Sequence, residues 1–284
     1  MTRKDSSLGA GEAPLGRQVE YPATVDPSVL FPISRADARA PLGIEAAALP
    51  FAGSDIWNAW EFSWLDAHGR PCVAVVELRV PCDSPNLVES KSLKLYLGGY
   101  AMIRFDDAQD VRARIADDVS AGVGAPIEVS LLEPAQFERL RVRDLAGESL
   151  DDQRIEITGY AEPDPNCLCT RAGARPVEEA LVTDLFRSRC PVTGQPDWAS
   201  VQVRHRGIPV DRAGLLRYLV SYREHAAFHE ACVERMFLDI QQRCRPLGLL
   251  VHARFLRRGG IDINPWRATP DFAVTLANVR TTRQ

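Results

Sequence analysis

Short runs rich in apolar and β-branched residues alternate along the chain with longer segments of mixed apolar and polar residues. Between residues 56 and 160 this pattern predicts the order strand, strand, helix, helix, strand, strand. The predicted strands cover residues 56–65, 72–80, 126–132 and 153–160, and the predicted helices lie near residues 86–97 and 106–121.

The same order starts again from Glu178. The predicted strands of this half lie at 180–188, 198–206, 247–257 and from 261 onward, with a turn at 190–197 and helices near 211–222 and 225–244. Two halves with one ββααββ plan predict an α+β fold built from a duplicated module.

A short internal repeat favours the duplication. A shift of 122 positions, from Tyr96 to Tyr218, also places Leu97 on Leu219 and Tyr100 on Tyr222. The segment 162–166 holds two prolines, which continue neither a helix nor a strand ladder, so it is the best candidate for a linker. We therefore expect an N-terminal tail and extension at 1–50, a first module at 51–163 and a second at 164–284.

Composition narrows the function classes. The chain has 284 residues, of which 45% are hydrophobic and 25% charged, which is typical of a globular protein with buried cores. A formal net charge of −4 argues against wrapping a long nucleic-acid backbone, although a local basic pocket for one phosphorylated cofactor is compatible with it. No apolar run reaches the length of a membrane span, and the polar, Gly-rich start predicts a flexible tail rather than a signal peptide.

Cysteine usage indicates the compartment. The chain has seven cysteines without a repeating spacing, and this odd number favours reduced thiols in the cytoplasm over a disulfide framework.

Cys190 is the strongest candidate for a catalytic residue. It lies in a predicted turn between two strands, with Arg187 and Arg189 close by in sequence and Asp197 seven residues later. Guanidinium groups near a thiol favour the nucleophilic thiolate, and a nearby carboxyl group can act as a proton donor. The alternatives are a half-buried structural cysteine and an aspartate that only closes the turn.

A second cluster falls on the predicted helix 225–244. His225 and His229 are four residues apart, which places them on one helical face and allows a metal site. The Glu that follows the second histidine, and the single residue between Cys167 and Cys169, do not fit the usual zinc spacings. We favour a substrate pocket instead, where His229 and Glu230 bind a polar heterocycle and Phe228 stacks on it.

Two further segments carry cationic or hydroxyl donors. The stretch from Glu89 to Lys94 includes Ser90 and Lys91 near a predicted helix start, where a phosphate can bind. Arg258 and Gly259 lie in a predicted turn that a ligand can approach closely. The alternatives are a solvated helical face and an ordinary hairpin turn. No dinucleotide fingerprint or P-loop sequence occurs, so neither of those folds is supported.

At several segments the chain resembles the bimodular NADPH-dependent 7-cyano-7-deazaguanine reductases, which are nitrile reductases of queuosine biosynthesis with a tunnelling fold. The matching segments cover nearly the whole chain and are Tyr21-Pro22, Leu30–Ile33, Glu89–Lys94, Cys190, Gln195–Trp198, Phe228–Glu230 and Arg258–Pro265. The hexapeptide from Glu89 to Lys94 is close to diagnostic of that family.

The resemblance implies a role for each matching residue. Cys190 is the nucleophile that forms a covalent thioimide, Asp197 is the proton donor, and His229 belongs to both the catalytic and the substrate-binding set. The resemblance places Glu89, Phe228 and Glu230 on the deazapurine substrate and Ser90, Lys91, Arg258 and Gly259 on NADPH, with no metal.

The resemblance also implies the fold and the assembly. Tunnelling-fold modules pack an antiparallel sheet against helices and assemble into a barrel, with sites between modules, so a cytoplasmic homodimer that binds neither nucleic acid nor membrane is expected. Two other functions stay open, namely a tunnelling-fold zinc hydrolase with Cys and His ligands and a non-catalytic purine-binding module.

Overall fold

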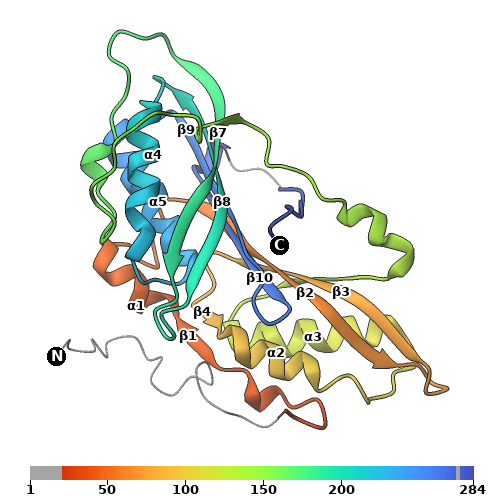
Figure 1. The fold of residues 1–284 in the computed structure, drawn as a ribbon. Helices are drawn as coiled ribbons and strands as arrows, with labels where there is room; N and C mark the ends of the chain where they lie inside the picture. Colours follow the sequence, from red (N-terminus) through yellow and green to blue (C-terminus); the bar gives the residue numbers. More distant parts are fainter. Residues whose placement is uncertain (1–20, 273–275) are drawn as a thin grey trace. The chain divides into compact units, whose positions relative to one another are not determined.

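The computed structural model of the chain describes residues 21–272 and 276–284. The predicted flexible tail falls mainly on residues 1–20, which lie outside the described residues. The chain divides into two compact units, and Figure 1 shows its helices and strands. Unit 1 comprises Met1–Leu49, Asp55–Leu140 and Arg257–Asp262, and unit 2 comprises Pro50–Ser54, Arg141–Leu256 and Ile263–Gln284.

Unit 1 combines a sheet with two helices. Its strands lie in the order β5 (Glu128–Leu132), β3 (Pro71–Pro81) and β2 (Ala52–Leu65). The helices are α2 (Ser90–Gly98) and α3 (Ala108–Val123). Helix α3 buries Val111, Ile115, Val119 and Val123. This spacing of four residues produces one apolar stripe, which is why the segment forms an amphipathic helix.

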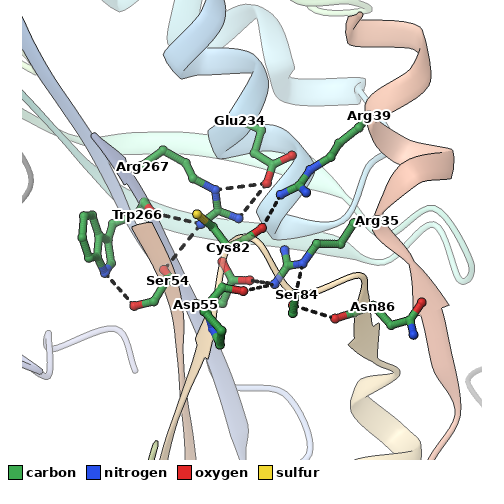
Figure 2. A network of polar contacts seen from close by, with 11 residues as sticks. Arg35, Arg39, Ser54, Asp55, Cys82, Ser84, Asn86, Glu234, Trp266 and Arg267 are labelled. Carbon is green, nitrogen blue, oxygen red and sulfur yellow. Dashed lines mark hydrogen bonds and ion pairs between the residues drawn. The ribbon is translucent and has the colours of Figure 1, made fainter. Parts of the chain in front are cut away.

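The segment before β2 is anchored in unit 1 by buried arginines. Helix α1 (Arg35–Arg39) places Arg35 against Asp55, with Nη2 to Oδ2 at 2.5 Å, and against Ser84, with Nε to Oγ at 3.0 Å (Figure 2). Arg39 donates to the carbonyl of Cys82 at 2.6 Å. Both arginines are only 3% exposed, so removing one partner leaves an uncompensated buried charge.

The segment before β2 also holds the start of α2. Strand β1 (Pro32–Ser34) pairs antiparallel with β4 (Asn86–Val88), and the backbone N–H of Glu89 donates to the carbonyl of Phe31 at 2.8 Å. The residue that opens α2 is therefore held by a segment more than fifty positions earlier in the chain.

Unit 2 repeats the plan of strands and helices. Its strands lie in the order β10 (Ile261–Ala268), β9 (Gly248–Phe255), β8 (Pro196–Gly207), β7 (Val177–Arg189) and β6 (Glu148–Ser149), where β6 is parallel to β7 and the other pairs are antiparallel. The helices are α4 (Arg212–Ser221) and α5 (His229–Cys244). All eight residues of β9 are buried, so this strand is covered on both faces. No helix in the described part of the chain is long and apolar enough to cross a membrane.

Most predicted elements are confirmed, and the fold is α+β as expected. The strand predicted at 153–160 is wrong, because these residues form no strand. The segment does alternate between half-buried and exposed side chains up to residue 157. Alternation shows only which side chains face the protein interior, whereas a strand also needs a neighbouring strand as its backbone hydrogen-bond partner. In the structure the partner of β7 on that side is the short β6.

Helix α5 also differs from the prediction, since it begins at His229 and not near 225. Residues 226–228 precede it in an irregular segment. Strand β8 in turn begins two residues early and includes Asp197.

The repeated tyrosines form the same network in each unit. In unit 1 the hydroxyls of Tyr96 and Tyr100 are 2.6 Å apart, and Tyr96 donates to Asp118 at 2.7 Å. In unit 2 the hydroxyls of Tyr218 and Tyr222 are 2.7 Å apart, and Tyr218 donates to Asp239 at 2.6 Å. Each pair also makes an edge-to-face ring contact, at 5.5 Å and 5.4 Å between centroids. The sequence repeat therefore marks a repeated link between the two helices of each unit.

We predict that this link stabilises unit 2. Burial raises the pKa of Tyr218 well above its ordinary value, so its hydroxyl stays neutral and donates to Asp239. Tyr218→Phe removes this donor and should lower the free energy of unfolding by about 1–3 kcal/mol, measured by urea denaturation. Tyr160→Phe is the control, because Tyr160 is 41% exposed, and it should change stability by less than about 0.5 kcal/mol. Equal effects of the two substitutions would contradict the prediction.

Candidate active site

Cys190 lies in unit 2, in the turn that joins β7 to β8. Its backbone N–H donates to the carbonyl of Gln195 at 2.9 Å, and its carbonyl accepts from the N–H of Gly194 at 2.9 Å. Gly194 has φ of +70°, a conformation that side chains with a Cβ adopt rarely. The turn is thus closed by the backbone of Cys190 itself. The residue is only 4% exposed, which places the thiol in a protected environment.

Asp197 lies on the strand that follows this turn. It is opposite Ser188 in the β7–β8 register, and both residues are buried, with Asp197 1% exposed. The prediction that Asp197 belongs to the turn is wrong. Because the turn is closed by backbone hydrogen bonds, a buried carboxyl group is available for another role.

The arginines beside Cys190 have a different environment from the one that the sequence suggested. Arg187 and Arg189 both form ion pairs with Glu224, at 2.6 and 2.7 Å. In a strand, alternate side chains point to opposite faces, so the two arginines lie on the face opposite to buried Ser188. The charges of both guanidinium groups are therefore compensated by Glu224.

His229 is brought to the turn by backbone pairing. The N–H of Arg189 donates to the carbonyl of His225 at 2.9 Å, and the N–H of Ala227 donates to the carbonyl of Arg189 at 3.1 Å. These bonds fix the segment that leads into α5, whose first residue is His229. The Nε2 atom of His229 lies 3.4 Å from Oδ2 of Asp197.

The ring of His229 is held by an aromatic contact. It stacks on Phe255 of β9 with 3.7 Å between centroids and 2° between ring planes. Within the described residues its Nδ1 atom is buried and has no hydrogen-bond partner. A buried polar atom without a partner is costly, so Nδ1 is suited to bind a ligand. No motif or spacing indicated that Phe255 belongs to this site.

The shared helical face expected for His225 and His229, on which the alternative of a metal site depended, is not present. His225 precedes α5, so the two residues do not share a helical face. Its Nδ1 instead contacts Glu162 at 2.8 Å, and burial lowers its pKa although Glu162 acts in the opposite direction. Within residues 21–272 and 276–284 no group of three or more His, Cys, Asp or Glu side chains is arranged to hold a metal ion.

Glu230 and Cys232 complete the cluster in unit 2. Glu230 is 4% exposed in the first turn of α5, and Phe228 is the residue just before the helix. Burial raises the pKa of Cys232 to about 12, and the carboxylates of Asp197 and Glu230 act in the same direction. Cys232 is therefore a neutral thiol beside the two acids. Its position three residues after His229 could have indicated it from the sequence, since both lie on one helical face.

A second group of predicted residues lies in unit 1 at the start of α2. Glu89 is the N-cap and is 2% exposed. Its carboxylate accepts from the backbone N–H groups of Lys91 at 2.7 Å and Ser92 at 2.9 Å, and from the hydroxyl of Ser90 at 3.2 Å. These N–H groups are the ones that a phosphate at a helix start uses, so the backbone donors are already occupied.

The turn with Arg258 and Gly259 belongs to the same unit. The N–H of Trp60 on β2 donates to the carbonyl of Gly260 at 3.0 Å. Asp262 accepts from the side chains of Trp60 and of Asn58, the latter at 2.8 Å. These bonds fix the turn on the sheet, as the hairpin interpretation predicted.

The turn lies close to α2. Gly259 has φ of +61°, and a Cβ atom at this position would lie 3.2 Å from Nζ of Lys94. Gly259, the residue after Arg258, thus lies beside Lys94 of α2, the helix whose first turn contains Ser90 and Lys91. The lack of a side chain at Gly259 leaves room beside the ammonium group. The arrangement is suited to an anionic ligand that needs several donors.

Two family models match parts of the chain. Residues 21–131 match the family described as "Nitrile reductase, 7-cyano-7-deazaguanine-reductase N-term", and residues 196–273 match the family described as "QueF-like protein". The first range contains Glu89 to Lys94, and the second contains Asp197, His229 and Arg258.

Close relatives extend over nearly the full length. The chain is 54% identical over 272 residues to the NADPH-dependent 7-cyano-7-deazaguanine reductase of Burkholderia vietnamiensis, covering 96% of this chain and 98% of the relative. It is 54% identical over 283 residues to the enzyme of the same name from Stenotrophomonas maltophilia, with 100% and 99% coverage, and 51% identical over 274 residues to that of Bordetella avium, with 96% and 98%.

The extent of these matches establishes the family, as the resemblance at the motifs implied. The chain belongs to the 7-cyano-7-deazaguanine reductases, a family of oxidoreductases that act on a nitrile.

Proposed function

We propose that this protein uses NADPH to reduce the nitrile of 7-cyano-7-deazaguanine to the primary amine, through a covalent intermediate on Cys190. The observation that carries the proposal is the cluster in unit 2, where Cys190 lies in the turn that leads directly to the Asp197–His229 pair. A protected thiol and a buried carboxyl group on one hairpin are the two groups that addition to a weak electrophile requires.

The first step is addition of the thiolate to the nitrile carbon. The new C–S bond forms as one π bond of the C≡N group breaks, and the nitrogen takes a proton from Asp197, which leaves a neutral thioimide. His229 contacts Asp197 through Nε2 and supports its orientation.

Binding of the deazapurine falls to the neighbouring side chains. Nδ1 of His229 and the carboxylate of Glu230 provide hydrogen-bonding groups for the heterocycle, and Phe228 at the N-cap of α5 provides an aromatic surface. Glu89 of unit 1 is proposed as a further substrate ligand. Its two oxygens accept three hydrogen bonds in the structure, and a carboxylate has room for a fourth.

The residues of unit 1 fit NADPH. Ser90, Lys91 and Arg258 supply a hydroxyl and two cations, and the space beside Gly259 and Lys94 would be filled by any Cβ. NADPH supplies hydride when bound, and reduction of a nitrile to an amine takes two such transfers. In the second half of the reaction Cys190 leaves as the thiolate, and the amine nitrogen receives its last proton from the site.

The wider setting follows from the same family. We propose that the amine enters queuosine biosynthesis, that the enzyme works in the cytoplasm, where Cys190 stays reduced, and that it is a homodimer. We further propose that residues 51–163 and 164–284 are tunnelling-fold modules that follow an extension at 1–50 and assemble into a barrel. The tyrosine network that each unit repeats supports this duplication.

The covalent step predicts a mass change without cofactor. Incubation with 7-cyano-7-deazaguanine alone should leave the protein heavier by one substrate, because addition precedes reduction. Cys190→Ala should abolish both the adduct and the reduction, measured by intact mass and by absorbance of the nicotinamide. Cys169→Ala removes an exposed thiol and should leave both adduct formation and nitrile reduction unchanged. An unmodified wild-type protein that still turns over would refute covalent catalysis.

The acid role predicts a kinetic defect without a folding defect. Asp197→Asn preserves the shape of the side chain but removes the acid, and should slow adduct formation and turnover by about 10²–10⁴ while the melting temperature stays nearly unchanged. Asp211→Asn is the matched control, since Asp211 caps α4 through the N–H of Gly214 at 2.7 Å. If Asp197→Asn melts early yet reduces the nitrile at the wild-type rate, Asp197 is structural.

The cationic side chains proposed to bind NADPH predict a preference for NADPH over NADH. Arg258→Glu should raise the apparent Michaelis constant for NADPH by about 10-fold or more, because it replaces an attractive charge by a repulsive one. Adduct formation in the absence of cofactor should stay as in the wild type. Arg175→Glu makes the same charge change at an exposed position of the other unit and should affect neither. Equal catalytic efficiency with NADPH and NADH would contradict the predicted role of Arg258.

A further inference from the structure

The side chain of Gln284 is buried in unit 2 although its neighbours Thr282 and Arg283 are exposed. Its Oε1 atom accepts from Nε of Arg254 at 3.0 Å and from the N–H of Thr281 at 3.1 Å. Its Nε2 atom donates to the carbonyl of Phe255 at 2.9 Å and to Oδ1 of Asn264 at 2.7 Å. Both ends of the amide are satisfied, and the donors of Arg254 fix which end is the oxygen.

This network replaces part of a strand ladder. The register between β9 and β10 pairs residues 250–252 with 266–268. Pro265 comes next on β10 and has no N–H to donate. At the end of β9 the N–H of Phe255 donates to the side chain of Asn264 at 3.2 Å, and its carbonyl accepts from Gln284. The backbone of Phe255 is therefore held by two side-chain amides that also bond to each other.

Phe255 is the residue on which His229 stacks. The rings are parallel, with 3.7 Å between centroids, and His229 lies 3.4 Å from Asp197. A chain of direct contacts thus leads from Gln284 through Phe255 and His229 to the buried acid. A stacked pair has one low-energy separation, so a shift of the Phe255 backbone moves the imidazole or opens the contact.

We propose that Gln284 is a positioning residue of the active site, which fixes Phe255 and through its ring holds His229 against Asp197. Gln284 contacts neither His229 nor Asp197 in any hydrogen bond described here, so its effect passes through Phe255. The consequence for reaction rate rests on the proposed function, whereas the consequence for the position of His229 does not.

A spectroscopic experiment tests the position of His229 directly. The chain has five histidines, so ring-labelled histidine gives few signals, and His229→Asn identifies the relevant one. In the wild type the Hε1 signal of His229 should be shifted upfield by the ring of Phe255 and should show cross-relaxation with the Phe255 ring protons. In Gln284→Ala both the upfield shift and the cross-relaxation should be lost.

Two further variants make the result specific. Thr282→Ala changes an exposed neighbour and should leave the His229 signal in place. Gln284→Glu retains the acceptor for Arg254. Its second carboxylate oxygen, however, faces the carbonyl of Phe255 and Oδ1 of Asn264, which are both acceptors and repel it. It should displace His229 at neutral pH, and acidification that protonates the new carboxyl group should restore part of the wild-type signal. If Gln284→Ala fails to fold, this variant provides the test.

Kinetics provide the second arm. Formation of the nitrile adduct should be slower by about 10-fold in Gln284→Ala, with a smaller change in substrate affinity, because the reacting groups are displaced rather than removed. An unchanged His229 signal in a folded Gln284→Ala or Gln284→Glu protein would overturn the proposal. A displaced His229 together with an unchanged rate of adduct formation would leave the positioning role standing and would instead count against the proposed use of His229 and Asp197 in the reaction.

Discussion

The candidate active site of unit 2 depends on the pairing of Arg189 with the segment that precedes α5. The two backbone hydrogen bonds of Arg189 to His225 and Ala227 are short-range in space but join residues that are far apart in sequence. They place the first turn of α5 beside the β7–β8 turn, so that His229 and Asp197 meet. Without this pairing Cys190 and Asp197 would still share one hairpin, but the groups contributed by α5 would have no fixed place beside that hairpin.

The two units have kept one scaffold and separated its chemistry. Each unit links its two helices through a tyrosine pair and an aspartate, and each opens its first helix with a carboxylate cap, Glu89 in α2 and Asp211 in α4. The β2–β3 turn of unit 1 has the half-buried Asp66 near the position that corresponds to Cys190. Conversely, the residue after Asp211 is an arginine where unit 1 has Ser90. Under the proposed function, two units with similar helix links would carry different groups, namely Cys190 in one and the proposed cofactor ligands in the other.

Much of this arrangement could be predicted from the sequence, because it is encoded locally. The apolar spacing of α3 and the alternation in β7 and β8 identify their elements, and Cys190, Asp197 and His229 stand out by their chemical type. The missed features depend on partners that are remote in sequence. The segment 153–160 alternates like a strand but has no strand to pair with. Glu224 forms ion pairs with Arg187 and Arg189. Phe255 contacts His229 only in the tertiary fold. Hydrophobic periodicity carries no information on any of these pairings.

The cap of α2 shows how a motif can have a different physical basis from the one that its position suggests. Hydroxyl and lysine side chains at a helix start are typical of a phosphate site in which backbone N–H groups bind the anion. Here the carboxylate of Glu89 occupies the N–H groups of Lys91 and Ser92 and adds a negative charge at the same place. At the proposed cofactor site an anion would therefore be held mainly by side chains, for which Lys91, Lys94 and Arg258 are the candidates. Binding by lysine and arginine side chains rather than by a helix end would make the affinity more sensitive to salt. The lack of a side chain at Gly259 would then decide how closely an anion can approach Lys94.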